Sequence, residues 1–295
     1  MDPSLVEIRP GRHVHIEATP SQGNSNSSLP VLLFVHGSCA HSGQWDAQLA
    51  WLLQRKDKNV SRVIRYDYFG CGKSLKPEEN AARLYSASEH YADLEAIFTK
   101  YCEASSEVWV IGHSFGCSMS LRLASEHVDK VTKLVFIAPT GVDFGHTLPS
   151  LFSLPTFVLG WMQPILRKGF VARAFHPDTL ERMPSLIENE QKMSDANPPY
   201  MFKAYYNSMP EYYNTEANQD NHSKWFQKVT YRVLLIYGED DQITPPGKIS
   251  GELVQKFANA ELALVATASH QVHQEQAEQV NALLDAYLFA GAEKG

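Results

Sequence analysis

Long apolar runs are absent from this sequence of 295 residues. No segment approaches the roughly 20 consecutive apolar residues that a transmembrane helix needs. The first residues, Met1 to Ser4, also lack the basic and apolar regions of a signal peptide. We therefore expect no transmembrane segment, while peripheral contact with a membrane surface stays open.

Cysteine is scarce and unpatterned. The four cysteines stand singly without a C-x-x-C pair, at Cys39, Cys71, Cys102 and Cys117. No cluster of His and Cys has the spacing of metal ligands. These absences favour reduced thiols and a cytoplasmic protein, and they predict neither a metal ion nor another cofactor.

Basic residues are outnumbered by acidic ones. The sequence has 26 Lys and Arg against 33 Asp and Glu, a formal net charge of −7, and no stretch rich in Lys or Arg. This balance argues against a nucleic-acid partner. A hydrophobic fraction of 44% is typical of a globular protein, and the length suffices for one large domain with or without an insertion. Composition does not indicate the oligomeric state.

Short apolar runs alternate with segments of helical periodicity along most of the chain. Leu5–Arg9 and His13–Glu17 predict a hairpin, and a Ser-x-x-Glu capping box predicts a helix over Ser86–Tyr101. The other predicted strands are Val31–Val35, Arg62–Tyr66, Val108–Ile111, Leu134–Ala138, Val233–Tyr237 and Leu262–Val265. The other predicted helices are Trp45–Leu53, Cys117–His127, Pro246–Phe257 and Glu275–Leu288. This order predicts an α/β fold with a mainly parallel central sheet flanked by helices.

Residues 143–226 interrupt the alternation. They are rich in aromatic residues, Met and Pro, and contain no run that resembles a sheet strand. Since a loop this long is uncommon inside a compact domain, we predict a helical cap over 143–226, inserted into a core formed by 1–142 and 227–295. Most of its apolar residues are expected to pack within the cap. A cap over the carboxyl edge of a sheet also roofs the ligand site, which makes Phe144, Trp161 and Tyr205 candidate pocket residues.

The pentapeptide Gly112-His113-Ser114-Phe115-Gly116 lies between a predicted strand and a predicted helix. It matches the nucleophile-elbow pattern G-x-S-x-G, in which the serine occupies a sharp strand-to-helix turn. Side chains at the two glycines would crowd the neighbouring strand and helix. The context, more than the five residues alone, makes Ser114 a candidate nucleophile, and His113 beside it a further candidate pocket residue.

Further motifs occur in a fixed order around this turn. His36-Gly37-Ser38 closes a strand, and the loop from Asp67 to Ser74 reads D-x-x-G-x-G-x-S with Cys71 between its two glycines. Another strand ends in the acidic loop from Gly238 to Pro245, and Ser269-His270 follows the last strand. With these motifs, the chain from about Val31 to Leu288, apart from the cap, resembles the α/β-hydrolase superfamily and in particular its capped serine hydrolases.

The resemblance implies a role for each of these positions. Ser114, Asp241 and His270 follow the family order of nucleophile, acid and base, and the backbone N–H groups of Ser38 and Phe115 correspond to the oxyanion-hole donors. The chemistry agrees with these residue types, because a serine hydroxyl needs a base and an imidazole needs a carboxylate that fixes its tautomer.

Several neighbours compete for these roles. Asp240 and Asp143 are the alternative acids, and His273 is the alternative base, although we expect its side chain to be solvated. His113 is expected to be structural rather than catalytic, because an elbow turns its side chain away from the serine. His36 is expected to brace its own loop.

The resemblance implies a carboxylesterase or lipase-like enzyme that cleaves an ester of an apolar acyl substrate through a covalent acyl-enzyme. A C–C bond hydrolase or a thioesterase would use the same three residues. A hydrolase-fold protein that binds a ligand or signals, with little turnover, is the alternative outside enzymes, because a fold alone does not establish a function.

Overall fold

The central feature of the computed structural model, which describes residues 5–20, 29–55, 60–140, 150–214 and 216–289, is one sheet of eight strands. The spatial order is β1-β2-β4-β3-β5-β6-β7-β8. The β1–β2 and β2–β4 pairs are antiparallel, and all other pairs are parallel. The bounds are Leu5–Arg9, Arg12–Pro20, Val31–Val35, Arg62–Tyr66, Val108–His113, Val131–Ile137, Val233–Gly238 and Ala260–Val265 for β1 to β8. The predicted α/β fold is confirmed.

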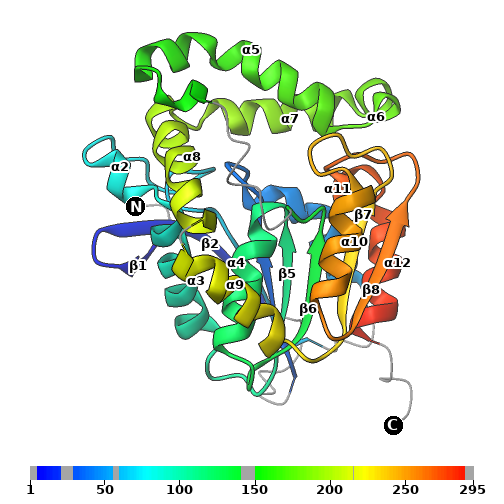
Figure 1. Ribbon diagram of the computed structural model, residues 1–295. Coiled ribbons are helices and arrows are strands. Elements are labelled where there is room, and N and C mark those ends of the chain that lie inside the picture. Colours follow the sequence, from blue (N-terminus) through cyan, green and yellow to red (C-terminus); the bar gives the residue numbers. More distant parts are fainter. Residues whose placement is uncertain (1–4, 21–28, 56–59, 141–149, 215, 290–295) are drawn as a thin grey trace.

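Helices cover both faces of the sheet (Figure 1). Along β3, Val31, Leu33 and Val35 join the apolar core on one face, whereas Leu32 and Phe34 join the core on the other, as the alternation of side chains along a strand requires. The first core contains residues of α3 (Ala87–Tyr101), α4 (Phe115–Glu126), α9 (Glu216–Lys228) and α10 (Pro246–Lys256). The second contains residues of α1 (Asp46–Gln54), α11 (Val272–Glu275) and α12 (Ala277–Leu288).

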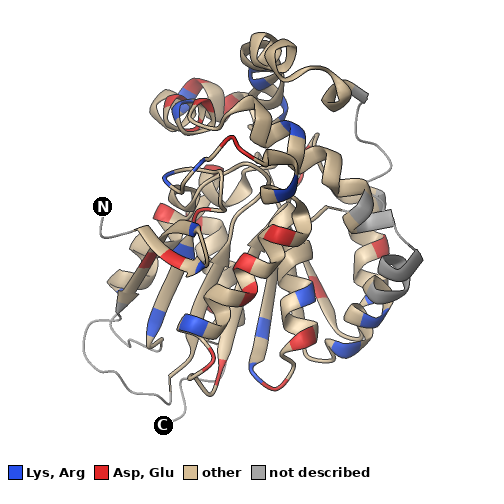
Figure 2. Cartoon of the chain, turned by 90° about the vertical axis from the view of Figure 1, so that its left-hand side faces the viewer, with Lys and Arg blue, Asp and Glu red and all other residues tan. Residues whose placement is uncertain are grey.

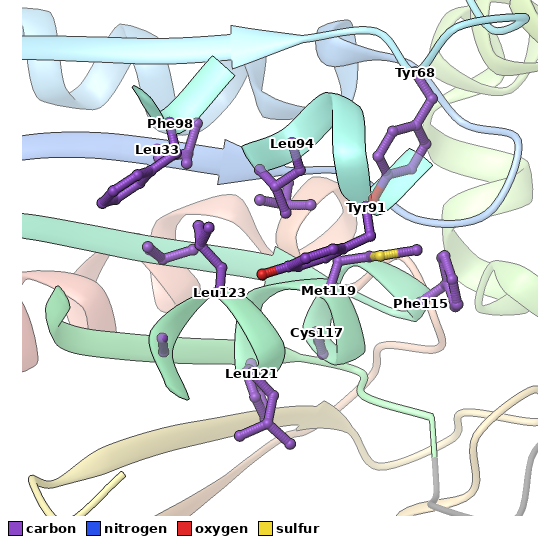
Figure 3. Packing of buried hydrophobic residues seen from close by; sticks show 14 of the residues in the cluster. Leu33, Tyr68, Tyr91, Leu94, Phe98, Phe115, Cys117, Met119, Leu121 and Leu123 are labelled. Atoms are coloured by element: carbon purple, nitrogen blue, oxygen red, sulfur yellow. The ribbon is translucent and has the colours of Figure 1, made fainter. Parts of the chain in front are cut away.

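The first core shows why α3 and α4 form at these positions. Tyr91, Leu94 and Phe98 of α3 face Met119 and Leu123 of α4 (Figure 3). Their spacing of three and four residues places them on one side of each helix. The N-terminus of α3 is capped as predicted, since the Ser86 hydroxyl accepts a hydrogen bond from the N–H of Glu89. These contacts pack α3 and α4 together on one face of the sheet.

The chain between β6 and β7 is a helical insertion. It contains the 3-10 helix η3 (Ser150–Ser153), α5 (Thr156–Ala174), α6 (Pro177–Arg182), α7 (Pro184–Asp195), α8 (Pro199–Asn214) and α9. Helices α5 and α7 lie above the sheet, and α8 leads from them toward α9, which packs beside α4 (Figure 1). We call α5, α6 and α7, which lie above the carboxyl edge of the sheet (Figure 1), the roof. The insertion thus supplies the roof and, with α9, one helix of the layer that covers the sheet.

Three further findings concern the described chain as a whole. None of the described helices is both long enough and apolar enough to cross a bilayer. Cys39, Cys71, Cys102 and Cys117 are all buried and free, as expected for reduced thiols. Acidic and basic residues occur on core and roof alike (Figure 2). The cytoplasmic location stays a prediction.

Candidate active site

Ser114 lies at the turn between β5 and α4. Its backbone has φ 52° and ψ −122°, a conformation that a residue with a side chain rarely adopts. The Ser114 N–H donates to the carbonyl oxygen of Ile137 at 2.9 Å, which ties the turn to the end of β6. Backbone strain of this kind costs about 1–3 kcal/mol and persists only where the surroundings enforce it. The turn thus holds the serine at the carboxyl edge of the sheet.

The two glycines of the pentapeptide are required by close backbone approach. A Cβ atom at Gly116 would lie 2.3 Å from the carbonyl oxygen of Val35, and one at Gly112 would lie 2.7 Å from the carbonyl oxygen of Gly116. Both distances are shorter than Cβ atoms tolerate. The predicted crowding against strand and helix is therefore present at both positions.

His270 connects Ser114 with Asp241. Nε2 of His270 lies 3.0 Å from the Ser114 hydroxyl, and Nδ1 lies 2.9 Å from Oδ2 of Asp241. With the Nδ1–H donated to the carboxylate, Nε2 is left to accept the hydroxyl proton. The three residues are at most 7% exposed. The structure thus brings together the three residues that the sequence assigns to one site.

Asp241 occupies a turn after β7 that gives both carboxylate oxygens partners. Oδ1 accepts from the N–H groups of Ile243 and Thr244, and Oδ2 accepts from the hydroxyl of Thr244 at 2.7 Å. Burial raises the pKa of Asp241, but the charge and hydrogen bond of His270 and the bonds from Thr244 outweigh it, so the pKa lies below its usual value. The carboxylate is therefore ionised beside the imidazole.

Of the two alternative acids, Asp240 has its carboxylate beside His176 and not beside His270. The side chain of Asp240 is 55% exposed and lies 3.5 Å from Nε2 of His176. Asp143 falls outside the described residues. Asp241 is thus the acid that the geometry favours.

His273 corrects one prediction. We expected it to be solvated, but it is fully buried, because α11 turns its ring inward, 4.7 Å from Trp45 and 4.5 Å from His113 between ring centroids. Burial and the charge of His270 lower the pKa of His273 to about 3. It is therefore a neutral packing residue beneath the site.

His113 supports the backbone of the candidate base. Its Nε2 lies 3.0 Å from the carbonyl oxygen of His270 and donates to it. Burial, followed by the charges of His273 and His270, lowers the pKa of His113 well below its usual value. The ring also lies on the wall of the cavity described below. His113 is accordingly a structural group that reaches the pocket.

The loop after β3 approaches Ser114 from the other side. Ser38 lines the same cavity as Ser114, and Phe115 is the first residue of α4, where backbone N–H groups have no acceptor within the helix. The loop is braced as predicted for His36, whose Nδ1 donates to the carbonyl of Gly37 while Nε2 accepts from the N–H of Tyr68. That the backbone N–H groups of Ser38 and Phe115 form an oxyanion hole remains a prediction.

Tyr205 supports this loop instead of lining the pocket. It is 1% exposed, and its hydroxyl lies 2.9 Å from Oγ of Ser38. Its ring packs edge-on against Phe115, whereas the following residue, Tyr206, lines the cavity. Successive helical residues differ in direction by about 100°, so the prediction of Tyr205 as a pocket residue is wrong by one position on α8.

A cavity of about 330 Å³ lies between Ser114 and the roof. That volume is at the lower end of the range for small-molecule sites. Ser114 and His270 line it from below, and most of its upper wall is apolar, formed by Leu159, Leu166, Phe170, Phe175, Phe202 and Tyr206. Gln163, Arg167, Glu190 and Gln191 add polar groups. The space accommodates an apolar group next to the hydroxyl.

Two other predicted pocket residues do not lie in this wall. Trp161 is 81% exposed, because it lies on the side of α5 opposite Leu159 and Leu166, which line the cavity. The prediction of Trp161 as a pocket residue is therefore wrong. Phe144 falls outside the described residues.

A buried carboxylate joins the roof to the His270 loop. Glu275 accepts from the N–H of Ser269 through Oε1, and from the N–H of His176 and the hydroxyl of Thr179 through Oε2. Burial raises the pKa of Glu275 against these hydrogen bonds. The Ser269 hydroxyl also donates to the carbonyl of Arg173 in α5. The position of His270 is thus tied to the roof.

A second link crosses from α7 to the core. Oε1 of Glu190 lies 3.1 Å from Nε2 of His41 and 2.8 Å from Nε2 of Gln274. Burial lowers the pKa of His41, but the hydrogen bond and charge of Glu190 outweigh it, so the pKa is raised. His41 follows the Ser38 loop directly, so both loops that frame Ser114 are joined to the roof.

Three residues of the site, Thr244, Glu190 and Glu275, were not predicted from the sequence. A local signal existed for Thr244, since an Asp side chain often accepts from the N–H groups two and three residues later. No such signal existed for the two glutamates, because their partners are far away in sequence. Within the described ranges, no three His, Cys, Asp or Glu side chains form a group that could hold a metal ion.

Comparisons with known proteins agree with this architecture. The family model described as alpha/beta hydrolase fold matches residues 30–277. Protein ABHD8 of Mus musculus is 29% identical over 286 residues, 95% of this chain and 60% of that protein, so the chain spans about 60% of the length of that relative. The bifunctional esterase/perhydrolase DCH of Acinetobacter calcoaceticus is 28% identical, with 88% of this chain and 91% of that protein covered.

A solved structure shows the same fold. Est816, described as an N-acyl homoserine lactone degrading enzyme, superposes with a TM-score of 0.73 at 18% identity, over 97% of this chain and all of that one. At that identity the likeness concerns the fold alone. Together with the match of the family model to most of the sequence, these findings show that the chain belongs to the alpha/beta hydrolase fold family.

Proposed function

We propose that this alpha/beta hydrolase cleaves an ester of an apolar acyl compound by nucleophilic catalysis. This proposal rests on the two hydrogen bonds of His270, at 3.0 Å to Ser114 and 2.9 Å to Asp241. Ser114 and His270 line the floor of an apolar cavity. Ser114 attacks the carbonyl carbon as Nε2 of His270 takes its proton. The alcohol leaves with that proton, and water then releases the acid from the acyl-enzyme by the same route.

The developing oxyanion requires donors that are in place before reaction. In the proposal these are the N–H groups of Ser38 and Phe115, each donor of this kind being worth about 2.7–4 kcal/mol. The N-terminus of α4 adds a favourable partial charge. Tyr205 holds Ser38 in position, and the ionised Asp241 stabilises the imidazolium of His270.

The proposed substrate class rests on the apolar upper wall of the cavity. Its apolar side chains suit an acyl chain, and DCH, a relative named as an esterase, supports ester chemistry. In this proposal residues 143–226 form the cap that closes the site. A C–C bond hydrolase or a thioesterase shares the three residues, so the test compares these substrates directly.

The test is steady-state hydrolysis of p-nitrophenyl esters from acetate to laurate, with the matching thioesters alongside. We expect kcat/KM to increase with acyl length until the cavity is filled, and Ser114→Ala to lower kcat at least about 10³-fold. Ser120→Ala, which changes a buried serine of the same α4 helix, is the control and keeps the activity. Retained turnover in Ser114→Ala contradicts the proposal. Release limited to one equivalent favours a ligand-binding protein.

A further inference from the structure

Helix α5 exposes a stripe of large apolar side chains on its outer side. Phe157, Trp161 and Ile165, spaced four residues apart, are 79%, 81% and 70% exposed. Residues at this spacing lie on one side of a helix, and α5 is the outermost helix of the roof (Figure 1). Single exposed apolar residues are ordinary, but a contiguous set marks an interaction surface. We call these three residues the α5 stripe.

The stripe differs from all other exposed apolar residues of the described chain. The remaining large ones are at most 49% exposed and are scattered over the core and roof, for example Leu53, Val128 and Leu264. The opposite side of α5 is apolar as well, since Leu159, Leu166 and Phe170 line the cavity. A helix that is apolar on both sides is normally covered on both sides. The cavity and core account for one side only.

The charge of α5 indicates what covers the other side. The helix contains Arg167, Lys168 and Arg173 and no Asp or Glu, although the whole protein has a net charge of −7. Arg167 pairs with Asp195 of α7. Lys168, three residues after Ile165 and thus on the side of the stripe, is exposed and forms no ion pair in the described structure, whereas Arg173 lines the cavity on the other side. An apolar stripe beside an uncompensated basic residue, on a helix without Asp or Glu, suits a helix that lies in a membrane interface.

We propose that the α5 stripe docks this protein on a lipid bilayer that contains anionic lipids. Phe157 and Ile165 enter the boundary between headgroups and acyl chains, Trp161 lies at the headgroup level, and Lys168 faces the anionic headgroups. Phe170, which lines the cavity and is 41% exposed, brings the cavity wall to the surface on the same helix. This docking adds to the proposed hydrolase activity and does not depend on it.

The test is flotation of the full protein with vesicles of phosphatidylcholine, alone or in an equal mixture with phosphatidylserine. We expect the wild-type protein to bind the mixed vesicles more strongly, and added salt to weaken the binding. The variant F157S/W161S/I165S should bind at least about tenfold more weakly. The control L53S/V128S/L264S, which removes three exposed apolar residues elsewhere, should bind as the wild type does.

Further readouts separate folding, docking and activity. Circular dichroism checks that both triple variants keep their helices, and hydrolysis of a water-soluble short ester checks the catalytic site, which contains none of the substituted residues. Brominated lipids should quench the fluorescence of the wild type more than that of Trp161→Phe.

Failure of the wild type to bind either vesicle, or equal binding by the stripe variant, overturns the proposal. So does a wild-type dimer that the stripe variant converts to a monomer without any vesicle binding. Absence of hydrolysis with intact docking would instead count against the proposed function alone.

Discussion

The floor and the roof of the cavity hold their side chains in opposite ways. On the floor, Ser114, Asp241 and His270 are buried and fixed by short turns and hydrogen bonds. On the roof, α5 presents apolar residues to the cavity and also to solvent. The floor is built for fixed geometry, as acid–base chemistry requires, whereas the roof is built for contact on two sides.

The largest expected effect concerns the floor. Asp241→Asn should lower kcat roughly 10⁴-fold, because the amide no longer holds the tautomer of His270 that can accept a proton from Ser114. Steady-state kinetics on a short ester measures this effect. Asp240→Asn, at the neighbouring and half-exposed carboxylate, is the matched control and should keep kcat within about twofold. A similar loss in both variants would remove Asp241 from its assigned role.

Two glycine substitutions test the difference in packing between the floor and the roof. Gly116→Ala should reduce the free energy of unfolding by about 1–3 kcal/mol, because its methyl group meets the carbonyl oxygen of Val35. Gly169→Ala on α5 meets nothing within 4 Å and should increase that free energy by about 0.5–1 kcal/mol. Urea unfolding measures both. A loss at Gly169 equal to that at Gly116 would show that the roof is as tightly packed as the floor.

These differences explain which features the sequence alone could predict. The elbow was predictable because its strand–turn–helix setting with two glycines has its own residue signature. Asp241 and His270 were predictable through the resemblance to capped serine hydrolases and the order of the three residues along the chain. The orientation of the roof residues was not, because α5 is apolar on both sides and the fold decides which side is inward. Trp161 of α5 was assigned to the pocket for this reason. Tyr205 of α8 was assigned to it because nothing in the sequence distinguishes its direction from that of the next residue, which lines the cavity. His273 was misplaced because nothing local indicates that α11 turns its ring inward.

The connection between floor and roof gives a smaller effect. Glu275→Gln replaces one acceptor oxygen with an NH₂ group, which faces either the N–H of Ser269 or that of His176. We expect about a tenfold decrease in kcat with KM nearly unchanged, as His270 loses part of its positioning. Glu278→Gln, an exposed glutamate on the next helix, is the control. An increase in KM alone would assign Glu275 to the roof and not to the His270 loop.

The smallest effect concerns pH and stability. Burial and the charge of His270 lower the pKa of His273 to about 3, so the unfolded chain binds a proton below pH 6.5 that the folded chain does not. His273 thus contributes stability that is complete above about pH 6.5 and is lost as the pH decreases toward 3. In His273→Gln, the slope of unfolding free energy against pH should decrease by at most about 1.4 kcal/mol per unit in this window. An unchanged slope would contradict a neutral buried imidazole.

The most direct test of the central claim is covalent labelling of the floor. The protein is incubated with a fluorophosphonate, its intact mass is measured, and the adduct is located by peptide mapping, for the wild type, Ser114→Ala and the control Ser120→Ala. Activation of Ser114 by His270 predicts a single adduct on Ser114 in the wild type and the control, and none in Ser114→Ala. An unlabelled wild type, or an adduct that persists in Ser114→Ala, would contradict the account of this site as a serine hydrolase.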